Sequence, residues 1–257
     1  MDARKQAIFI TGAASGIGRA TAELFAERGW LVGAADRDAG GLEALAGPSG
    51  GAIVSFSLDV TDRAAVLASL EQFAQASGGR LDCVFANAGI DAKGAFAEME
   101  WAAVARLVEI NLLGAMSVIH AALSMLRATP GSLCLATASG SAIFGVGGMA
   151  AYSATKRGVR GLIEALSVEL APAGVRAADL LPGIVDTGML PPEAKAALPS
   201  EGMWRPVPAS AVAEAAWAAY HGDPLHLFVP GELEAYDHRA TAEAIAVRDG
   251  WRAGRMP

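Results

Sequence analysis

The stretch that decides the fold is residues 6–18, Gln-Ala-Ile-Phe-Ile-Thr-Gly-Ala-Ala-Ser-Gly-Ile-Gly. Its first half is a short apolar run with β-branched residues, which predicts a buried strand over residues 6–11. The glycine-rich turn is followed by residues 19–28, which predict a helix closed by Gly29. Glycines let a pyrophosphate approach the backbone, and a helix N-terminus offers it free N–H groups. The pattern therefore indicates a dinucleotide site, although an ordinary tight turn between strand and helix has the same outline.

A second predicted strand, residues 31–35, ends at Asp36. A carboxylate at this position accepts hydrogen bonds from adenosine ribose hydroxyls and repels a 2′-phosphate. Arg37 favours the other cofactor, NADP(H), because a guanidinium there can hold that phosphate. Neither Ala14 nor Ser15 supplies a second positive charge, so we expect NAD(H) to be preferred over NADP(H). The alternative role for Asp36 is that of a turn residue at a strand end.

Strand-like and helix-like segments alternate along the rest of the chain. Further apolar runs of strand length lie at residues 52–58, 81–86, 131–137, 175–181 and 226–229. Helical patterns lie at residues 61–77, 101–127, 152–170 and 210–220. This alternation predicts a doubly wound α/β fold: a mostly parallel, seven-stranded sheet with helices on both faces and its functional turns at one edge. No composition shift marks a boundary, so we expect a single domain over residues 1–257.

Polar residues stand where two of these strands end. The candidates are Asp59, Val60, Asn87, Ala88 and Gly89. Ligands of open α/β sheets bind outside the carboxyl ends of the strands, although Asp and Asn are also frequent turn formers. Asn111 interrupts the apolar face of the helix predicted over residues 101–127. A polar side chain there needs partners, so Asn111 is either a packing feature or a member of an active-site network.

Tyr152 and Lys156 are four residues apart, which places them one turn apart on one face of a helix. A tyrosine pKa of about 10 makes a poor base near neutrality, but a neighbouring ammonium favours the phenolate and lowers that pKa. Ser139, thirteen positions upstream, is placed to hydrogen-bond the same substrate oxygen. The three residues form a candidate proton-transfer site for an alcohol or a carbonyl. The same spacing also occurs in helices where a half-buried ring simply lies beside a surface lysine.

The composition limits the partners and the compartment. A net charge of −7 and a pI near 5.1 argue against nucleic acid and anionic membranes as partners. We find no apolar run long enough to span a bilayer and no room for a signal peptide before residue 6, so we expect a cytoplasmic protein. Cys83 and Cys134 lie in apolar runs, where a buried reduced thiol is expected. None of the four histidines sits at a motif, and no spacing predicts a metal site.

The last third of the chain is less regular. Residues 189–208 are Pro-rich and predict a short helical insert or flap over the site, or else a surface loop whose apolar residues pack down. Pro230 cannot donate to a strand ladder, so pairing is expected to stop there. The tail of residues 232–257 is polar and predicts a helix over residues 232–252. We expect it to pack across a neighbouring subunit or the cleft.

The motifs together resemble those of the short-chain dehydrogenase/reductase family, in its shorter single-domain branch. They cover about residues 7–187 and fall in family order at family spacing. They are Thr11-Gly12-x-x-x-Gly16-x-Gly18, Asp59-Val60, Asn87-Ala88-Gly89, Asn111, Ser139, Tyr152-x-x-x-Lys156 and Pro182-Gly183-x-x-x-Thr187. The resemblance implies a Rossmann-type fold that binds a nicotinamide dinucleotide.

The resemblance also implies a role for each matched residue. Tyr152 would be the general acid/base, and Ser139 would orient and polarise the substrate oxygen. Lys156 would lower the pKa of Tyr152 and hold the nicotinamide ribose, while Asn111 would fix a water that links Lys156 to solvent. The other residues implied at the cofactor are Gly12, Ser15, Gly16, Ile17 and Gly18 at the pyrophosphate, Asp36 and Arg37 at the adenosine ribose, Asp59 and Val60 at the adenine, Asn87, Ala88 and Gly89 along the cleft, and Pro182, Gly183, Ile184 and Thr187 at the carboxamide.

The leading hypothesis is an NAD(H)-dependent oxidoreductase that acts on a secondary alcohol or ketone. The expected substrate residues are Ser139, Ser141, Phe144, Met149, Tyr152, Ile184 and Met189, with Trp204 as a further candidate. This mostly apolar lining favours a hydrophobic or ring-bearing substrate, and Lys93 is expected on an exposed loop. The alternatives are a catalytically idle dinucleotide-binding sensor or scaffold, and an epimerase or lyase on the same fold. The resemblance also implies a homotetramer or homodimer.

Overall fold

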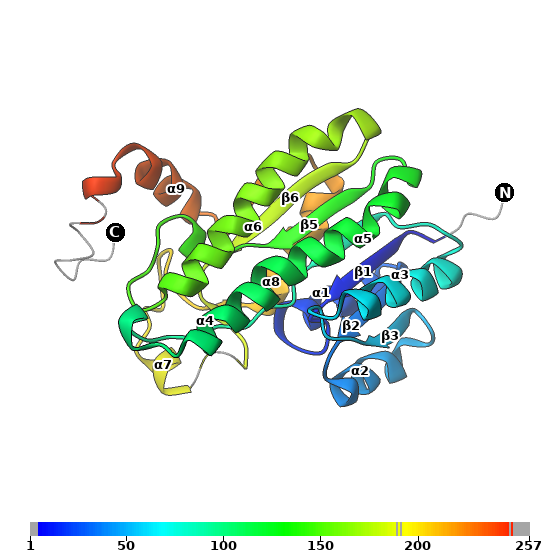
Figure 1. Ribbon diagram of the computed structural model, residues 1–257, viewed down its shortest axis with the longest axis horizontal. Coiled ribbons are helices and arrows are strands. Elements are labelled where there is room, and N and C mark those ends of the chain that lie inside the picture. The colour runs from blue at the N-terminus through cyan, green and yellow to red at the C-terminus, as the bar shows by residue number, and fades with distance from the viewer. Residues whose placement is uncertain (1–4, 189, 191, 247, 249–257) are drawn as a thin grey trace.

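The computed structural model describes residues 5–188, 190, 192–246 and 248 of the 257-residue chain. Seven strands form one parallel sheet in the order β3-β2-β1-β4-β5-β6-β9 (Figure 1). They are β1 Ala7–Thr11, β2 Leu31–Asp36, β3 Ile53–Ser57, β4 Cys83–Ala86, β5 Leu133–Thr137, β6 Arg176–Pro182 and β9 His226–Val229. The predicted fold class is confirmed. The order reverses at β1, so the turns after β1 and β4 diverge and leave a crevice between them.

Helices cover both faces of the sheet. One face carries α1 Gly16–Glu27, α2 Ala39–Ala46 and α8 Ala209–His221. The other carries α3 Arg63–Ser77, α4 Trp101–Val108, α5 Ala115–Ala128 and α6 Ala150–Glu169. A π-helical turn, Glu109–Gly114, joins α4 to α5, and single 3-10 turns lie at Gly47–Ser49, Phe96–Glu98, Gly140–Ala142 and Ala171–Ala173. The predicted helices are all present, whereas α2 was not predicted.

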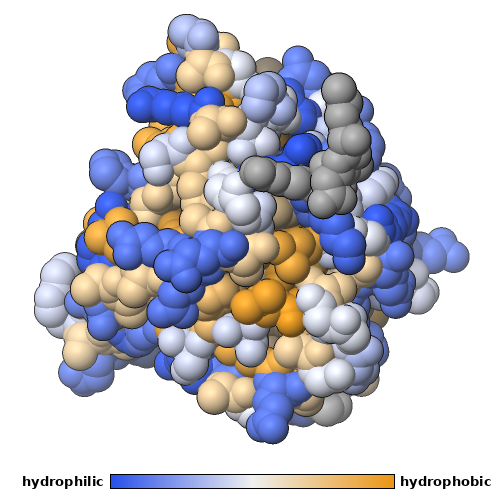
Figure 2. Space-filling view, turned by 90° about the vertical axis from the view of Figure 1, so that its right-hand side faces the viewer, coloured by the Kyte–Doolittle hydropathy of each residue, from blue (hydrophilic) through white to orange (hydrophobic). Residues whose placement is uncertain are grey.

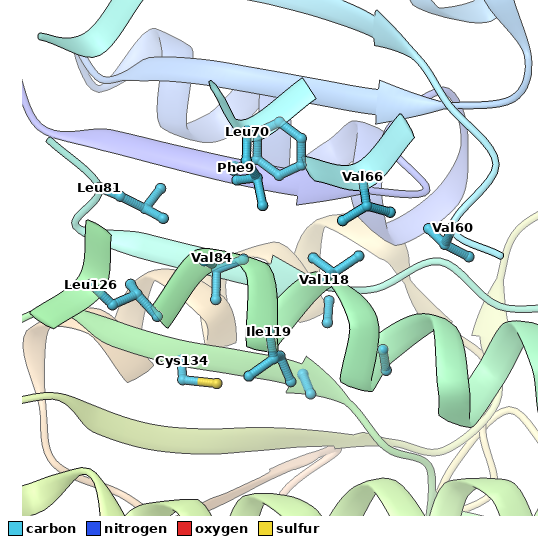
Figure 3. Close-up of a cluster of buried hydrophobic side chains, with 14 of the residues drawn as sticks. Phe9, Val60, Val66, Leu70, Leu81, Val84, Val118, Ile119, Leu126 and Cys134 are labelled. Carbon is cyan, nitrogen blue, oxygen red and sulfur yellow. The ribbon is translucent and has the colours of Figure 1, made fainter. Parts of the chain in front are cut away.

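The strands are buried on both faces, which is why their sequences are continuous apolar runs. All five residues of β1 are buried: Phe9 faces α3 and α5, while Ile8 and Ile10 face the opposite helices. Figure 3 shows Phe9, Val84 and Cys134 of the sheet packed against side chains from α3 and α5. Cys83 and Cys134 are both buried free thiols, as expected, and burial raises the pKa of each.

The helix of residues 101–128 corrects one expectation. It is long and apolar enough to cross a membrane by length and composition, so the statement that no run reaches that length is wrong. In the structure, 44% of its most apolar window is buried, and α5 packs on β4 and β5. Packing on the sheet accounts for the apolar composition of this helix.

The insert and the tail are only partly helical. Residues 189–208 contain α7 Pro192–Ala196, and a short pair of strands, β7 Val185–Asp186 and β8 Val207–Pro208, closes the base of this insert. In the tail, α9 Leu233–Ala242 is followed by a non-helical Glu243 and then by helical residues 244–246 and 248, so the predicted helix is interrupted at Glu243. The end of that predicted helix, at residues 249–252, lies outside the described residues. Pairing of β9 with β6 stops at Val229, before Pro230, as expected.

A buried carboxylate closes the sheet at the amino ends of its strands. Asp82 accepts hydrogen bonds from the Ala7 amide (2.9 Å), from Arg80 (2.6 and 2.7 Å) and from the Tyr220 hydroxyl (3.2 Å). These contacts join β1, the start of β4 and α8. Figure 2 views this side of the molecule, where hydrophilic residues surround a smaller hydrophobic group. No local pattern indicates that Asp82, directly before a strand, is almost fully buried.

We expect Asp82→Asn to lower the free energy of unfolding by about 2–3 kcal/mol, because an amide replaces a buried acceptor with a donor that faces other donors. Asp62→Asn is the matched control: Asp62 caps α3 through the Ala64 and Ala65 amides, and Asn caps a helix equally well. Urea unfolding of both variants measures the effect. Equal stability of the two variants would contradict the role assigned to Asp82.

Candidate active site

The turns after the carboxyl ends of the strands enclose one cavity of about 750 Å³. Most of the residues predicted for the site line it. They are Gly12, Ser15, Gly16, Ile17, Asp36, Arg37, Asp59, Val60, Asn87, Ala88, Gly89, Ser139, Ser141, Met149, Tyr152, Lys156, Pro182, Gly183, Ile184 and Thr187. The structure therefore brings together, on one edge of the sheet, segments spread over 175 residues of sequence (12–187).

The glycine-rich turn owes its shape to contacts between backbone segments. Gly12 has a φ of +70°, and a β-carbon on it would lie 2.9 Å from the Cα of Ala88. A β-carbon on Gly18 would lie 2.0 Å from the Gly12 carbonyl oxygen. Gly18 thus packs α1 onto the end of β1, and it is not among the residues that line the cavity.

The N-terminus of α1 opens into the cavity. Gly16 begins the helix, and Ser15 makes no capping hydrogen bond with its side chain to any residue that the structure describes. The first N–H groups of α1 and the positive end of its dipole are therefore available to an anion. Across the cavity, Thr187 lies 3.2 Å from a β-carbon built on Gly16. This arrangement fits the pyrophosphate of a dinucleotide.

Asp36 ties the second strand to the glycine-rich turn. One of its carboxylate oxygens accepts from the Ala14 amide (3.1 Å) and the other from the Asp38 amide (3.0 Å). Each oxygen keeps a lone pair, and the residue lines the cavity next to Arg37. The carboxylate is thus held in place to accept hydrogen bonds from a diol.

Asp59 has a partner that the sequence did not reveal. It accepts from the Thr61 amide (2.9 Å) and hydroxyl (2.7 Å), and Arg106 of α4 donates to its other oxygen (3.0 Å). The Thr61 hydrogen bonds, followed by that of Arg106, lower the pKa of Asp59. Arg106 lines the cavity as well. No local pattern marks Arg106, because its partner Asp59 lies 47 residues away in the sequence and only the fold brings the two together.

Asn87 fastens the turns after three strands to one another. Its Nδ2 donates to the carbonyl oxygens of Thr11 (3.1 Å) and Gly12 (3.4 Å), and its backbone amide donates to the Thr11 hydroxyl (3.1 Å). Its Oδ1 accepts from the Thr137 hydroxyl at 2.9 Å. The predicted ligand-lining residue is therefore also the link that fixes the spacing of β1, β4 and β5.

Ser139, Tyr152 and Lys156 meet on one wall of the cavity. Lys156 is buried, and its ammonium donates to the Thr137 carbonyl oxygen at 2.9 Å and lies 5.8 Å from the centre of the Tyr152 ring. Burial lowers the pKa of Lys156 to about 8. Burial also raises the pKa of Tyr152, against a hydrogen bond with Ser139 that lowers it, and the nearby Asp91 carboxylate raises it further. Desolvation is thus the largest influence on the pKa of Tyr152 in this structure, and the lowering effect expected of Lys156 stays a prediction.

Asn111 stands behind this wall, in the π-helical turn between α4 and α5. It is 1% exposed, and its amide exchanges two hydrogen bonds of 2.9 Å with the backbone of Ile90 and donates to Thr155 at 3.3 Å. A β-carbon on Gly89 would lie 3.3 Å from Asn111 Oδ1 and 3.4 Å from Lys156 Nζ. Asn111 does not line the cavity, but it is joined to the same wall as Lys156. A π turn at such a position is a frequent mark of a functional site.

The substrate end differs from the prediction at Phe144. Phe144 does not line the cavity; the 3-10 turn Gly140–Ala142 carries it into a separate hydrophobic cluster. Met189 lies outside the described residues. Lys93 lies on an exposed loop, as expected, and also lines the cavity. The lining residues that the sequence analysis did not assign to the site include Asp91, Val146, Leu190 and Leu198. No group of potential metal ligands occurs among the residues that the structure describes.

Comparison with known proteins identifies relatives of the whole chain. A model of the family described as short chain dehydrogenase matches residues 6–197. Cis-4-hydroxycyclohexanecarboxylate dehydrogenase of Sinomonas cyclohexanicum is 35% identical over 244 residues, which cover 91% of this chain and 95% of that protein. The structure of 3-ketoacyl-(acyl-carrier-protein) reductase from Brucella melitensis complexed with NADH matches with a TM-score of 0.79 at 30% identity, over 87% of this chain and 96% of that one. An alcohol dehydrogenase from the archaeon Thermococcus sibiricus, complexed with 5-hydroxy-NADP, matches with a TM-score of 0.76 at 27% identity, over 87% and 95%.

The buried lysine gives a pH dependence of stability that can be measured. Between pH 8 and the ordinary lysine pKa of 10.5, the unfolded chain holds a proton that native Lys156 has released, so stability rises with pH. The Lys156→Met variant has no titratable group at this position, so this contribution to the pH dependence is absent from it. We expect the free energy of unfolding of the wild type, relative to Lys156→Met, to increase by up to about 3 kcal/mol from pH 8 to pH 10.5.

Urea unfolding of both proteins across this pH range measures the difference. Lys5→Met, at an exposed position near the N-terminus, keeps Lys156 and serves as the control: its free energy of unfolding should change with pH as that of the wild type does. A difference between wild type and Lys156→Met that does not change with pH would show that the native ammonium is not destabilised by burial.

Proposed function

The chain belongs to the short-chain dehydrogenase family of oxidoreductases, and we propose that it is an NAD(H)-dependent enzyme that interconverts a secondary alcohol and a ketone. One observation carries the proposal. Ser139, Tyr152 and Lys156 converge on the same cavity that is walled, at its other end, by the open N-terminus of α1. Hydride transfer to or from a carbonyl carbon requires a proton-transfer group and a dinucleotide site in the same cavity.

The residues divide the work between binding and proton transfer. A nicotinamide dinucleotide held in this cavity would supply the hydride chemistry. The Tyr152 oxygen takes the hydroxyl proton when an alcohol is oxidised and returns it to the carbonyl oxygen when a ketone is reduced. Ser139, on the same wall of the cavity as Tyr152, donates to the same substrate oxygen and polarises it. The buried charge of Lys156 favours the phenolate that forms during turnover and offers donors to a ribose.

Asn111 connects this wall to the interior. Its hydrogen bonds with the Ile90 backbone hold the loop after β4 against the π-helical turn, close to Lys156. We propose that this loop and Asn111 position a water that passes the proton from Lys156 to solvent. The carbonyl groups left open by a π turn are suited to bind such a water.

The cofactor preference rests on Asp36. Relatives with NADH and with 5-hydroxy-NADP bound support a nicotinamide dinucleotide in this cavity. The Asp36 carboxylate is fixed by two backbone amides at the cavity wall, so it cannot turn away from a 2′-phosphate without breaking them. Arg37 is the one neighbour on that strand end that favours the phosphate. The fixed negative charge favours NAD(H).

The substrate is proposed to be an apolar, ring-bearing alcohol or ketone. The described side chains beyond Tyr152 are mostly apolar: Val146, Met149, Ile184, Leu190, Leu198 and Trp204. Lys93 lies on the same cavity and could meet a polar substituent at its mouth. The relative from Sinomonas cyclohexanicum is named for a hydroxylated cyclohexane ring that carries a carboxylate, which agrees with such a cavity.

A homodimer or homotetramer is proposed on the face formed by α4, α5 and α6. Trp101 and Val168 are each 74% exposed there, and Leu113 and Met116 are exposed on the same helices. Apolar groups of this size on paired helices favour a protein contact.

The net charge of −7 and the packing of the 101–128 helix on the sheet support a cytoplasmic protein that binds neither nucleic acid nor membranes.

The first test follows NADH formation over a panel of aliphatic, cyclic, aryl and steroid secondary alcohols. We expect Tyr152→Phe to lower kcat by about 10²–10⁴-fold, because the phenol that carries the proton is lost, while NADH still binds. Tyr220→Phe is the matched control, since Tyr220 lies at the opposite edge of the sheet. Near-normal turnover by Tyr152→Phe would exclude this residue as the acid/base. If the wild type forms no NADH with any of the alcohols but still binds NADH, the result would favour a protein that binds the dinucleotide without catalysis.

A second test addresses the cofactor. Asp36→Asn keeps an acceptor for the Ala14 amide but removes the charge, so we expect the kcat/KM ratio of NADP⁺ to NAD⁺ to rise about tenfold, or about 1.4 kcal/mol. Asp38→Asn, two residues away, retains the cap of α2 and should leave the ratio unchanged. A wild type that uses both cofactors equally well would show that Asp36 does not select between them.

A further inference from the structure

The C-terminal helix α9 packs directly behind the turns that carry the substrate end of the cavity. A β-carbon on Gly183 or on Gly140 would lie 3.3 or 3.8 Å from Leu233 Cδ1, at the start of α9. Gly140 follows Ser139, and Gly183 belongs to the turn after β6. In Figure 1, α9 lies at the left, on the side to which the strands point. The helix therefore supports the two turns from outside the cavity.

The second contact of α9 reaches the cavity wall itself. Trp204 of the insert lines the cavity, and the Tyr236 ring meets it edge to face, with the ring centroids 5.7 Å apart and the planes at 72°. Tyr236 is 2% exposed and belongs to the same hydrophobic cluster as Leu233, Phe144 and Phe228. One side of the indole thus faces the cavity while another rests on a buried ring that cannot move independently of α9.

An ion pair fixes α9 to the helix that carries Tyr152. The two terminal nitrogens of the Arg160 guanidinium donate to the two oxygens of Asp237, one of them at 2.9 Å. Arg160 is 8% exposed and lies on α6 two turns after Tyr152, and it also donates to Glu164 at 3.1 Å. A buried, two-point pair of this kind holds the orientation of both partners. The second link, Arg205 to Glu232 at 2.7 Å, is exposed and contributes less.

We propose that α9 determines which alcohols the cavity accepts: Tyr236 holds Trp204 as the wall of the substrate end, and the Arg160–Asp237 pair holds α9. This inference rests on the proposed function, because it concerns the substrate of that same site. Trp204, Tyr236 and Asp237 all lie beyond residue 197, where the match to the family model ends. The substrate wall is thus a feature of this chain's C-terminal part, and Tyr236 and Asp237 act on substrate through Trp204 as positioning residues.

The test compares Tyr236→Ala with Tyr236→Phe and with Glu234→Ala, an exposed α9 control. The measured quantity is kcat/KM for a series of cyclic alcohols of increasing ring substitution, with NADH affinity measured in parallel. We expect Tyr236→Ala to shift the ratio of bulky to small alcohols at least about tenfold in favour of the bulky ones, at unchanged NADH affinity. Tyr236→Phe and Glu234→Ala should keep the wild-type ratio. An equal fall for all alcohols, or no change, would overturn the proposal.

A second variant and a second readout keep the test decisive. Asp237→Asn weakens the ion pair with Arg160 but keeps the Tyr236 ring, so it should also shift the kcat/KM ratio toward bulky alcohols. Glu164 accepts from the same guanidinium but lies on α6, so Glu164→Gln should leave the ratio unchanged. Acrylamide quenching of Trp204, taken as the difference between each protein and its Trp204→Phe form, should increase in Tyr236→Ala. This readout needs no turnover. Unchanged quenching would therefore contradict the positioning role of Tyr236 even if the protein oxidises no alcohol. A lack of turnover on every alcohol would instead count against the proposed function.

Discussion

The structure depends on one close approach between backbone segments: the carbonyl oxygen of Gly12 at the end of β1 lies where a side chain on Gly18 would have to be. This contact lets α1 begin immediately above the strand and directs its N-terminus into the cavity. Asn87 adds hydrogen bonds to the carbonyl oxygens of Thr11 and Gly12 and so fixes the next strand to the same turn. Because these are contacts of main chain, they leave little freedom in how the anion site is shaped.

At the wall formed by Ser139, Tyr152 and Lys156, burial has the largest influence on the pKa values of the tyrosine and the lysine. Desolvation lowers the pKa of Lys156 and raises that of Tyr152, so each group is pushed toward its neutral form. The ionised pair has the compensating attraction of opposite charges, with the ammonium 5.8 Å from the ring centre. Charge on either residue therefore makes charge on the other less unfavourable. The two protonation states are coupled through this site, and Thr137 fixes the distance by accepting the lysine hydrogen bond.

Sequence reasoning recovered what is encoded locally. Continuous apolar runs predicted the seven strands, and glycine spacing with polar strand ends predicted most of the cavity wall. It missed α2, whose Gly40 and Gly41 lower helix propensity although Asp38 caps the helix. It also missed Arg106 and Arg160, because a charged residue on a helix looks solvent-exposed until the tertiary fold supplies an acid from another element. Phe144 was misplaced because a three-residue turn, which carries no apolar period, reverses the chain after Ser139.

The two ends of the cavity differ in the kind of contact that builds them. The cofactor end is made of backbone turns and strand ends, where a glycine or an asparagine is needed for a geometric reason and is therefore visible in the sequence. The substrate end is made of side-chain contacts between residues far apart in the chain, such as Trp204 with Tyr236 and Gly183 with Leu233. Contacts of that kind can be exchanged for others of similar volume without disturbing the sheet. A change in α9 can therefore alter the substrate wall while the dinucleotide site, built from backbone at the opposite end, keeps its shape.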